Sequence, residues 1–137
     1  MSAIFRVTFD NIAGLWPQVE PLVAQGLRGA PTHDAEDVRK MLYTGSCQLW
    51  VQCDIPVVEA VVISEFVAYP KGVWLRVWIA SARPDPGMDT DEFLEKLTSF
   101  ARQNNCAGFE AIGRHGWARR IKEAKIEGLL MRVTFNE

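Results

Sequence analysis

The stretch Val73-Trp-Leu-Arg-Val-Trp-Ile-Ala-Ser81, with the turn and the segment 90–104 that follow it, decides the fold of this chain. β-branched and aromatic residues dominate the quoted stretch, which predicts a strand. In the segment 90–104 the apolar residues recur at helical spacing, which predicts an amphipathic helix. The members of this apolar stripe are Phe93, Leu94, Leu97, Phe100 and Ala101. Together these elements form the first half of a strand–helix–strand unit.

The start of this predicted helix is acidic. In an α/β domain the first turn of a helix after a strand commonly holds a phosphate, because its N–H groups have no partner within the helix. Here Asp89, Asp91 and Glu92 occupy that turn. Carboxylates cap a helix well, and they oppose the binding of an anion at the same place.

Length and composition indicate one globular domain spanning residues 1–137. The chain is 48% hydrophobic and 23% charged, which excludes long disordered segments, and its formal net charge is −2. No net attraction to nucleic acid or to an anionic membrane follows from that charge. The chain also lacks a secretory leader pattern and an apolar run of about 20 residues, so no membrane span and a cytoplasmic location are expected.

Cysteines and histidines predict neither a disulfide nor a metal site. Cys47, Cys53 and Cys106 cannot all pair, and reduced, buried thiols are the expected state. His33 and His115 have no Cys, Asp or Glu at ligand spacing beside them, so no metal is expected.

The rest of the chain supplies the other elements of an α/β fold. Before the central strand we expect a strand over 4–9, a helix over 16–28, a helix from the Asp34 cap to Leu42, and strands over 47–53 and 57–69. Pro17 suits the first helical position, and Pro21 would kink or delay the first helix. After residue 104 we expect a strand over 107–112 that returns parallel to 73–81, a helix over 117–125 and a strand over 129–135.

The middle strands predict an antiparallel meander with a specific register. With Pro70 and Lys71 as turn residues, Val67 faces Trp74, Glu65 faces Arg76 and Ile63 faces Trp78. The same alternation places Gln48, Trp50, Gln52 and Glu59 on that face. Two interpretations of this face stay open: a Glu65–Arg76 pair covered by a helix, or a ligand cleft or homodimer surface that is rich in tryptophan.

This element order resembles the GNAT superfamily of acyl-CoA-dependent N-acyltransferases. The run Gly113-Arg-His-Gly-Trp-Ala-Arg119 also resembles small GNAT-like proteins of tailed phages, in which "GR-x-GW-x-R" follows the fifth strand. The resemblance implies a single α/β (α+β) domain. Its mixed central sheet would have about 6–7 strands, with an antiparallel meander, a βαβ crossover and helices on both faces.

The resemblance also implies a chemistry. Acetyl-CoA would donate its acetyl group to a small-molecule or protein amine by direct attack, with a carboxylate accepting the proton. The candidate bases are Glu65, Glu59 and Glu110, and the residues implied to hold the cofactor are Ala80, Ser81, Ala82, Arg83, Gly87, Met88 and Arg114.

The chain departs from the family pattern at two places, and these keep a second function open. The turn after the central strand has one glycine and several acids, and the fourth helix lacks the tyrosine that would protonate the leaving thiolate. The alternative is a catalytically inactive GNAT-fold binding module, or one associated with a phage virion. The basic stretch 114–125 is interpreted as a solvated helix face, so nucleic acid is not expected as a partner.

Overall fold

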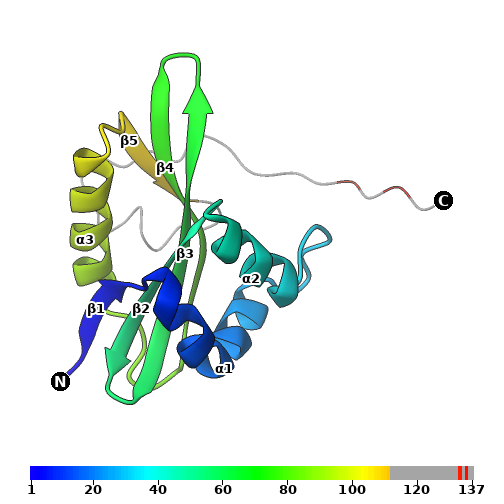
Figure 1. Cartoon of the computed structure of the whole chain (residues 1–137), viewed down its shortest axis with the longest axis vertical. Coiled ribbons are helices and arrows are strands. Elements are labelled where there is room, and N and C mark those ends of the chain that lie inside the picture. The colour runs from blue at the N-terminus through cyan, green and yellow to red at the C-terminus, as the bar shows by residue number, and fades with distance from the viewer. Residues whose placement is uncertain (112–132, 134, 136–137) are drawn as a thin grey trace.

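One mixed sheet forms the centre of the molecule (Figure 1). The computed structural model describes residues 1–111, 133 and 135. The strands are β1 (Ala3–Arg6), β2 (Gln48–Asp54), β3 (Val57–Tyr69), β4 (Gly72–Ala82) and β5 (Gly108–Ala111), and the helices are α1 (Phe9–Gly26), α2 (Ala35–Thr44) and α3 (Thr90–Gln103). The strands lie in the order β1-β2-β3-β4-β5, antiparallel except for the parallel pair β4 and β5.

The architecture confirms the mixed α+β class, the antiparallel meander and the β4–α3–β5 crossover. Helices α1 and α2 cover one face of the sheet and α3 covers the other (Figure 1). The described part of the chain holds five strands. The helix expected over 117–125 lies outside the described residues, as does the strand expected over 129–135 apart from Val133 and Phe135, so a sheet of 6–7 strands stays a prediction. Within the described ranges, no helix combines the length and the apolar character that crossing a bilayer requires.

Helix α1 begins earlier than the sequence predicts. The expected first strand, 4–9, ends at Arg6, and Phe9 is already helical, so both Pro17 and Pro21 lie inside α1. The two prolines are exposed and four residues apart, hence on one solvent-facing side of the helix. Water can hydrogen-bond the carbonyl groups that the missing proline N–H groups leave unpaired there.

Helix α2 begins at the predicted Asp34 cap and ends at Thr44, two residues beyond the predicted Leu42. The Asp34 side chain accepts a hydrogen bond from Asp37 N at 2.9 Å, and the Asp37 side chain accepts one from Asp34 N at 2.9 Å, which forms a capping box. Gly45 ends the helix at φ +79°, in the left-handed region that glycine adopts without a steric penalty.

Two bulges change the predicted side-chain alternation. The ladder confirms that Glu65 lies opposite Arg76 and Val67 opposite Trp74, but a register shift at Ile63/Ser64 places Ile63 opposite Ile79, so its predicted pairing with Trp78 is wrong. A second shift occurs at Gln52/Cys53. Because a bulge adds one residue to one strand, the residues beyond it exchange faces.

The predicted clustering of the three tryptophans on one face is therefore wrong. Trp50 is buried on the α3 side, where its Nε1–H donates to Ser64 Oγ at 2.9 Å. Trp78 packs instead against the core beneath α1 and α2. Trp74 and Arg76 alternate with Leu75 and are on the α1/α2 side, because Leu75 belongs to the α3 core.

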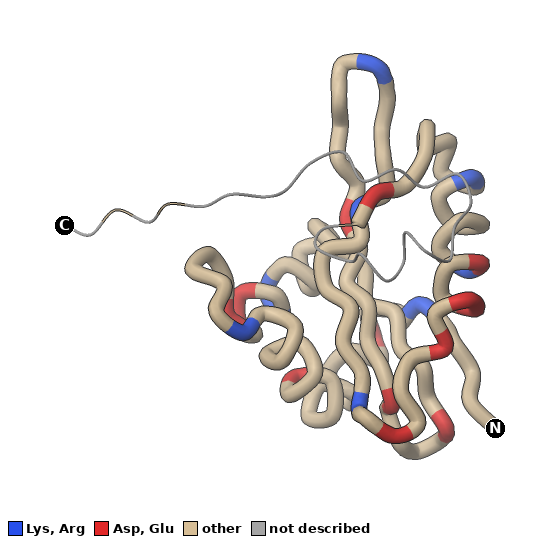
Figure 2. The backbone as a smooth tube through the Cα atoms, turned by 180° about the vertical axis from the view of Figure 1, so that it is seen from behind, with Lys and Arg blue, Asp and Glu red and all other residues tan. Residues whose placement is uncertain are grey.

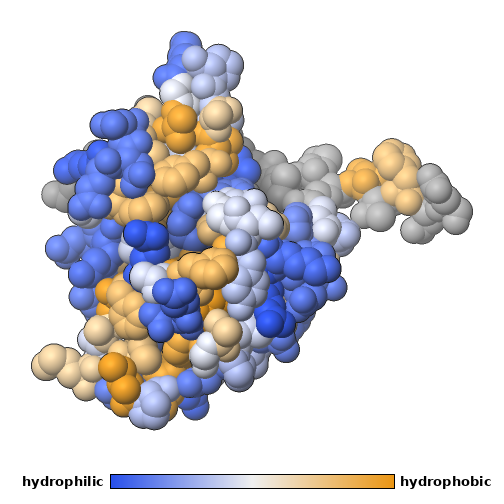
Figure 3. Space-filling view, in the orientation of Figure 1, coloured by the Kyte–Doolittle hydropathy of each residue, from blue (hydrophilic) through white to orange (hydrophobic). Residues whose placement is uncertain are grey.

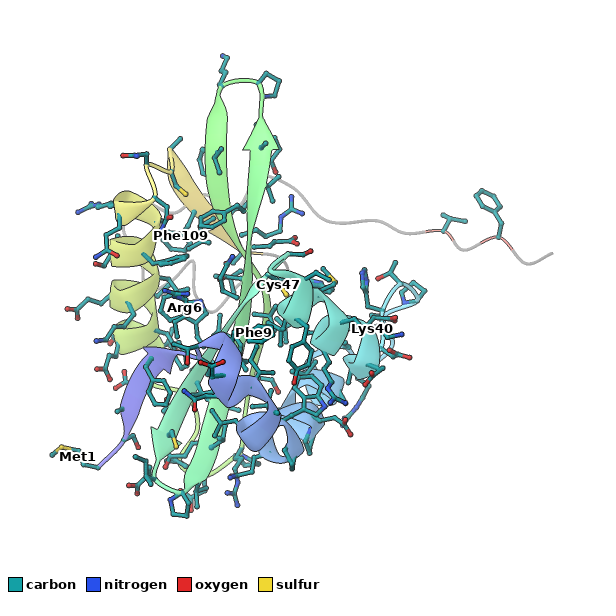
Figure 4. All side chains as sticks on the ribbon, viewed as in Figure 1. Met1, Arg6, Phe9, Lys40, Cys47 and Phe109 are labelled. Carbon is teal, nitrogen blue, oxygen red and sulfur yellow. The ribbon has the colours of Figure 1, made fainter. Side chains whose placement is uncertain are left out.

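The sheet separates two hydrophobic cores. The first core lies beneath α1 and α2 and includes the fully buried residues Val19, Val23, Val38, Val51 and Val61. The second core lies beneath α3 and includes the fully buried residues Leu75, Phe93 and Leu97. Figure 4 places Cys47 inside the molecule where α2 leads into β2, and Arg6 beside α3.

Candidate functional site

Strands β4 and β5 pair in parallel up to the last described residue of β5. The ladder runs from Trp74 opposite Gly108 to Val77 opposite Ala111. Strand β4 runs on to Ala82, with its other edge paired with β3. Parallel partners of the segment 78–82 would follow Ala111 and lie outside the described residues.

The predicted thioester-binding residues Ala80, Ser81 and Ala82 lie on this part of β4. Ala80 is buried in the α3 core, and Ser81 is buried opposite Val61. Within the described part of the chain, the Ser81 hydroxyl has no hydrogen-bond partner. The side chains of Ala80 and Ser81 point to the two faces of the sheet, so a ligand lying along the edge of β4 would meet backbone groups and not these side chains.

The loop between β4 and α3 carries Arg83, Gly87 and Met88. Arg83 is exposed, and Gly87 has φ +84°, with the Pro84 carbonyl oxygen 3.9 Å from the position of an added Cβ, which is an ordinary contact distance. Figure 2 shows acidic positions (red) where this loop enters α3. The loop offers backbone access to a phosphate together with an unfavourable field.

Two backbone N–H groups at the start of α3 already have acceptors within the protein. The Asp89 side chain accepts a hydrogen bond from Glu92 N at 3.2 Å, as expected of an N-cap residue. Asp89 N donates to Gln52 Oε1 at 2.7 Å. These two N–H groups are occupied, so a phosphate at this helix would have to bind to other donors.

Arg76 forms the centre of a cluster on the α1/α2 side of the sheet, where β4 pairs with β5. Its Nε donates to Glu110 Oε1 at 3.2 Å, its Nη2 donates to Tyr69 Oη at 3.0 Å, and its Nη1 lies 3.5 Å from Glu65 Oε1. Tyr69 Oη in turn donates to Glu110 Oε1 at 2.7 Å. The four residues come from β3, β4 and β5, and we call them the Arg76 cluster.

The Arg76 cluster has one more carboxylate than cations, so its formal charge is negative. Burial works against the charge of Arg76, but the hydrogen bond with Tyr69 and the charge of Glu110 outweigh it, so the pKa of Arg76 is raised. The guanidinium therefore stays charged, and the surplus carboxylate charge can attract a cationic amine.

Cys47 is buried near Glu65, on the side of the sheet that α2 covers. Burial, with a smaller contribution from the charge of Glu65, raises the pKa of the Cys47 thiol to about 12. Burial also raises the pKa of Cys53 and of Cys106. All three cysteines are free. A neutral, buried thiol is a poor nucleophile, so the structure gives Cys47 a packing role.

The stability of the protein is expected to fall in alkaline solution because of Cys47. The thiol pKa is 9.0 in the unfolded chain and about 12 in the folded one, so this stabilisation is complete below pH 9 and is lost as the pH rises towards 12. Between pH 9 and 10 the free energy of unfolding should fall by about 1 kcal/mol more in the wild type than in Cys47→Ala. Denaturant unfolding at both pH values measures the difference, and equal slopes would contradict the raised pKa.

The three candidate bases lie on opposite faces of the sheet. Glu65 and Glu110 meet at Arg76, as described above, so the predicted Glu65–Arg76 pair is present and has a second carboxylate. Glu59 lies on the other face, 8% exposed, and accepts hydrogen bonds from Ser2 Oγ and from Gln52 Nε2. Because protein donors enclose Glu59, it is poorly placed to take a proton from a substrate beside the cluster.

The sequence did not predict that Tyr69 and His33 lie near β4 in this part of the molecule. Tyr69 faces the same way as Glu65 by simple strand alternation, which was a usable signal for its place in the Arg76 cluster. His33, on the connection between α1 and α2, contacts Trp78 with ring centroids 4.7 Å apart. Nothing local in the sequence indicates that this connection reaches β4. Arg114 lies outside the described residues, as does the run 113–119 that carries the phage-like motif.

Comparison with known proteins identifies the fold. No protein-family model matches the chain, and no curated protein matches its sequence. An aminoglycoside acetyltransferase from an uncultured soil metagenomic sample, solved with sisomicin, is similar at a TM-score of 0.77 and 10% identity, over 98% of this chain and 97% of that one. A predicted acetyltransferase from Clostridium acetobutylicum, solved with acetyl-CoA, gives 0.69 and 13%, over 96% of each chain.

A GNAT family acetyltransferase from Staphylococcus aureus is also similar, with a TM-score of 0.66 and 13% identity over 96% of this chain and 98% of that one. The structure therefore has the fold of GNAT acetyltransferases. At these identities the likeness concerns the fold, and activity has to be argued from the site.

Proposed function

We propose that this protein is an acyl-CoA-dependent N-acyltransferase that transfers an acetyl group from acetyl-CoA to an amine by direct attack. The observation that carries the proposal is the Arg76 cluster beside β4, in which the carboxylate of Glu110 is held by Tyr69 and Arg76 and stays partly exposed. An extended thioester that lies along β4 would bring the acyl group near this proton acceptor. Solved structures of the same fold that contain acetyl-CoA or sisomicin support this choice of substrates.

In this proposal the segment 78–82 of β4 binds the extended arm of the cofactor through backbone hydrogen bonds. A backbone N–H on that edge polarises the thioester carbonyl, as in an oxyanion hole. Acetyl-CoA supplies the activated acyl group: the amine nitrogen forms the new C–N bond, the C–S bond breaks, and coenzyme A leaves as a thiolate that takes a proton from solvent.

Glu110 is the proposed base for the amine proton. It is on β5 opposite Arg76 and thus on the strand next to β4. Tyr69 and Arg76 both donate to its Oε1, which fixes the orientation of the carboxylate. Its side chain is 33% exposed, so an incoming amine can reach it. Glu65 binds the other side of Arg76 and adds negative charge for the cationic acceptor.

Calorimetry with acetyl-CoA tests the proposal. We expect weak binding, because Asp91 and Glu92 lie in the first turn of α3, where each carboxylate opposes an anion by about 0.3–1 kcal/mol. The double variant Asp91→Asn/Glu92→Gln should therefore bind about 3- to 30-fold more tightly, and Arg83→Ala should bind more weakly.

The outcomes separate the alternatives. No detectable binding by any of the three folded proteins would reject acyl transfer and leave the non-catalytic GNAT-fold module. Tight binding by the wild type, with no gain in the double variant, would show that these carboxylates do not face the pyrophosphate.

A further inference from the structure

A buried glutamine connects the sheet to the loop between β4 and α3. Gln52 on β2 is 4% exposed. Its Nε2 donates to Glu59 Oε1 at 3.0 Å and to the Gly87 carbonyl oxygen at 3.0 Å, and its Oε1 accepts from Asp89 N at 2.7 Å. Both Nε2 hydrogens and the amide oxygen are thus in use. Two of the three bonds go to the loop, which follows Gln52 by 35 and 37 residues in the chain.

Glu59 fixes the other side of this network. Its carboxylate accepts from Gln52 Nε2 and from Ser2 Oγ, and its main-chain carbonyl accepts from Arg83 N at 2.9 Å. The loop is therefore held at its start by the Glu59 main chain and at its end by the Gln52 side chain. The side-chain hydrogen bonds of Gln52 and Glu59 are partly or fully buried, so the loss of one partner leaves a polar group that water replaces only in part.

We infer that Gln52 is a positioning residue for acyl-CoA binding, acting through the loop 83–89. The inference depends on the proposed function, because it takes this loop as the binding place of the cofactor pyrophosphate. A loop that is already ordered loses less conformational entropy when a ligand binds, so a fixed loop binds more tightly than a free one. Glu59 orients the Gln52 carboxamide, which gives this buried carboxylate a role other than that of a base.

The variant Gln52→Met tests the inference against a matched control. Methionine has a similar length and is tolerated in apolar surroundings, but it forms none of the three hydrogen bonds. Gln48→Met is the control, because Gln48 lies on the same strand and face and accepts from Ser64 Oγ at 2.8 Å, far along the strand from the loop. The dissociation constant for coenzyme A should rise at least about tenfold in Gln52→Met and change less than about twofold in Gln48→Met.

A second readout follows the loop without any ligand. Amide hydrogen exchange by NMR should be at least about tenfold faster at Asp89 in Gln52→Met than in the wild type, because that N–H loses its acceptor. Gln48→Met should leave the exchange of the Asp89 amide unchanged, whatever it does to global stability.

Each result has a definite meaning. Unchanged coenzyme A affinity in Gln52→Met, or an equal loss in both variants, would overturn the positioning role. If the wild type binds no coenzyme A, the proposed acyl transfer fails, and the Asp89 exchange then decides the loop attachment by itself: faster exchange in Gln52→Met alone supports it, and equal exchange in all three proteins overturns it.

Discussion

The turnover number for acetyl transfer is expected to fall by about 10²- to 10⁴-fold in Glu110→Gln. Glutamine fills the same volume, and its amide oxygen can still accept the hydrogen bonds from Tyr69 and Arg76 that the carboxylate accepts now. It cannot take a proton from the amine, so the loss falls on the chemical step. Steady-state kinetics with acetyl-CoA and a polyamine or aminoglycoside acceptor measures it, with KM for acetyl-CoA expected to stay close to the wild-type value.

Glu65→Gln is the matched control for that variant, since Glu65 contacts the same guanidinium from the opposite strand at 3.5 Å. Glu65→Gln should lower the turnover number clearly less than Glu110→Gln does, and it should raise the KM for the cationic acceptor. A larger loss in Glu65→Gln than in Glu110→Gln would transfer the role of base to Glu65. Equal small losses would mean that neither carboxylate accepts the proton in the rate-limiting step.

Phe93→Ala is expected to lower the free energy of unfolding by about 3–5 kcal/mol. Phe93 is fully buried at the start of α3, in the core that it shares with Leu75 and Val77. The truncation removes a large apolar surface and leaves a cavity that the closely packed sheet cannot fill. Guanidinium unfolding monitored by circular dichroism measures the change as a lower midpoint at constant slope.

Phe100→Ala is the control on the same helix. Phe100 is only partly buried and stacks on Phe66, with ring centroids 5.6 Å apart, so its truncation should cost less. An equal cost for both variants would contradict the difference in burial. Figure 3 shows that apolar and polar residues interleave on the molecular surface, and single exposed apolar side chains such as Phe66 contribute little by themselves.

The sequence predicted the elements better than the side-chain faces. Turn and capping signals are local, so the bounds of β3, the Asp34 cap and the Glu65–Arg76 register could all be predicted from a few neighbouring residues. Bulges have no comparable local signal. Those at Gln52/Cys53 and Ile63/Ser64 reversed the predicted faces of whole strand segments, because alternation propagates any one-residue error.

The candidate site could also be predicted only in part from the sequence. Glu65, Arg76 and Glu110 come together through strand pairing, which an element order with a parallel β5 can predict. The bonds of Gln52 to Gly87 and Asp89 join a strand to a loop, and no periodic pattern indicates them. From the sequence alone, Gln52 is indistinguishable from the other polar residues of a mixed face.

The described residues of the two cores are synthesised at different times on the ribosome. Among them, the core beneath α1 and α2 draws on positions up to Ile63 and on Ile79, whereas the core beneath α3 also needs Phe93 to Ala101. A growing chain can therefore cover one face of the sheet while Leu75, Val77 and Ala80 on the other face still lack their helix. During that interval the nascent chain exposes an apolar β-surface, the kind of surface that chaperones shield and that self-association exploits.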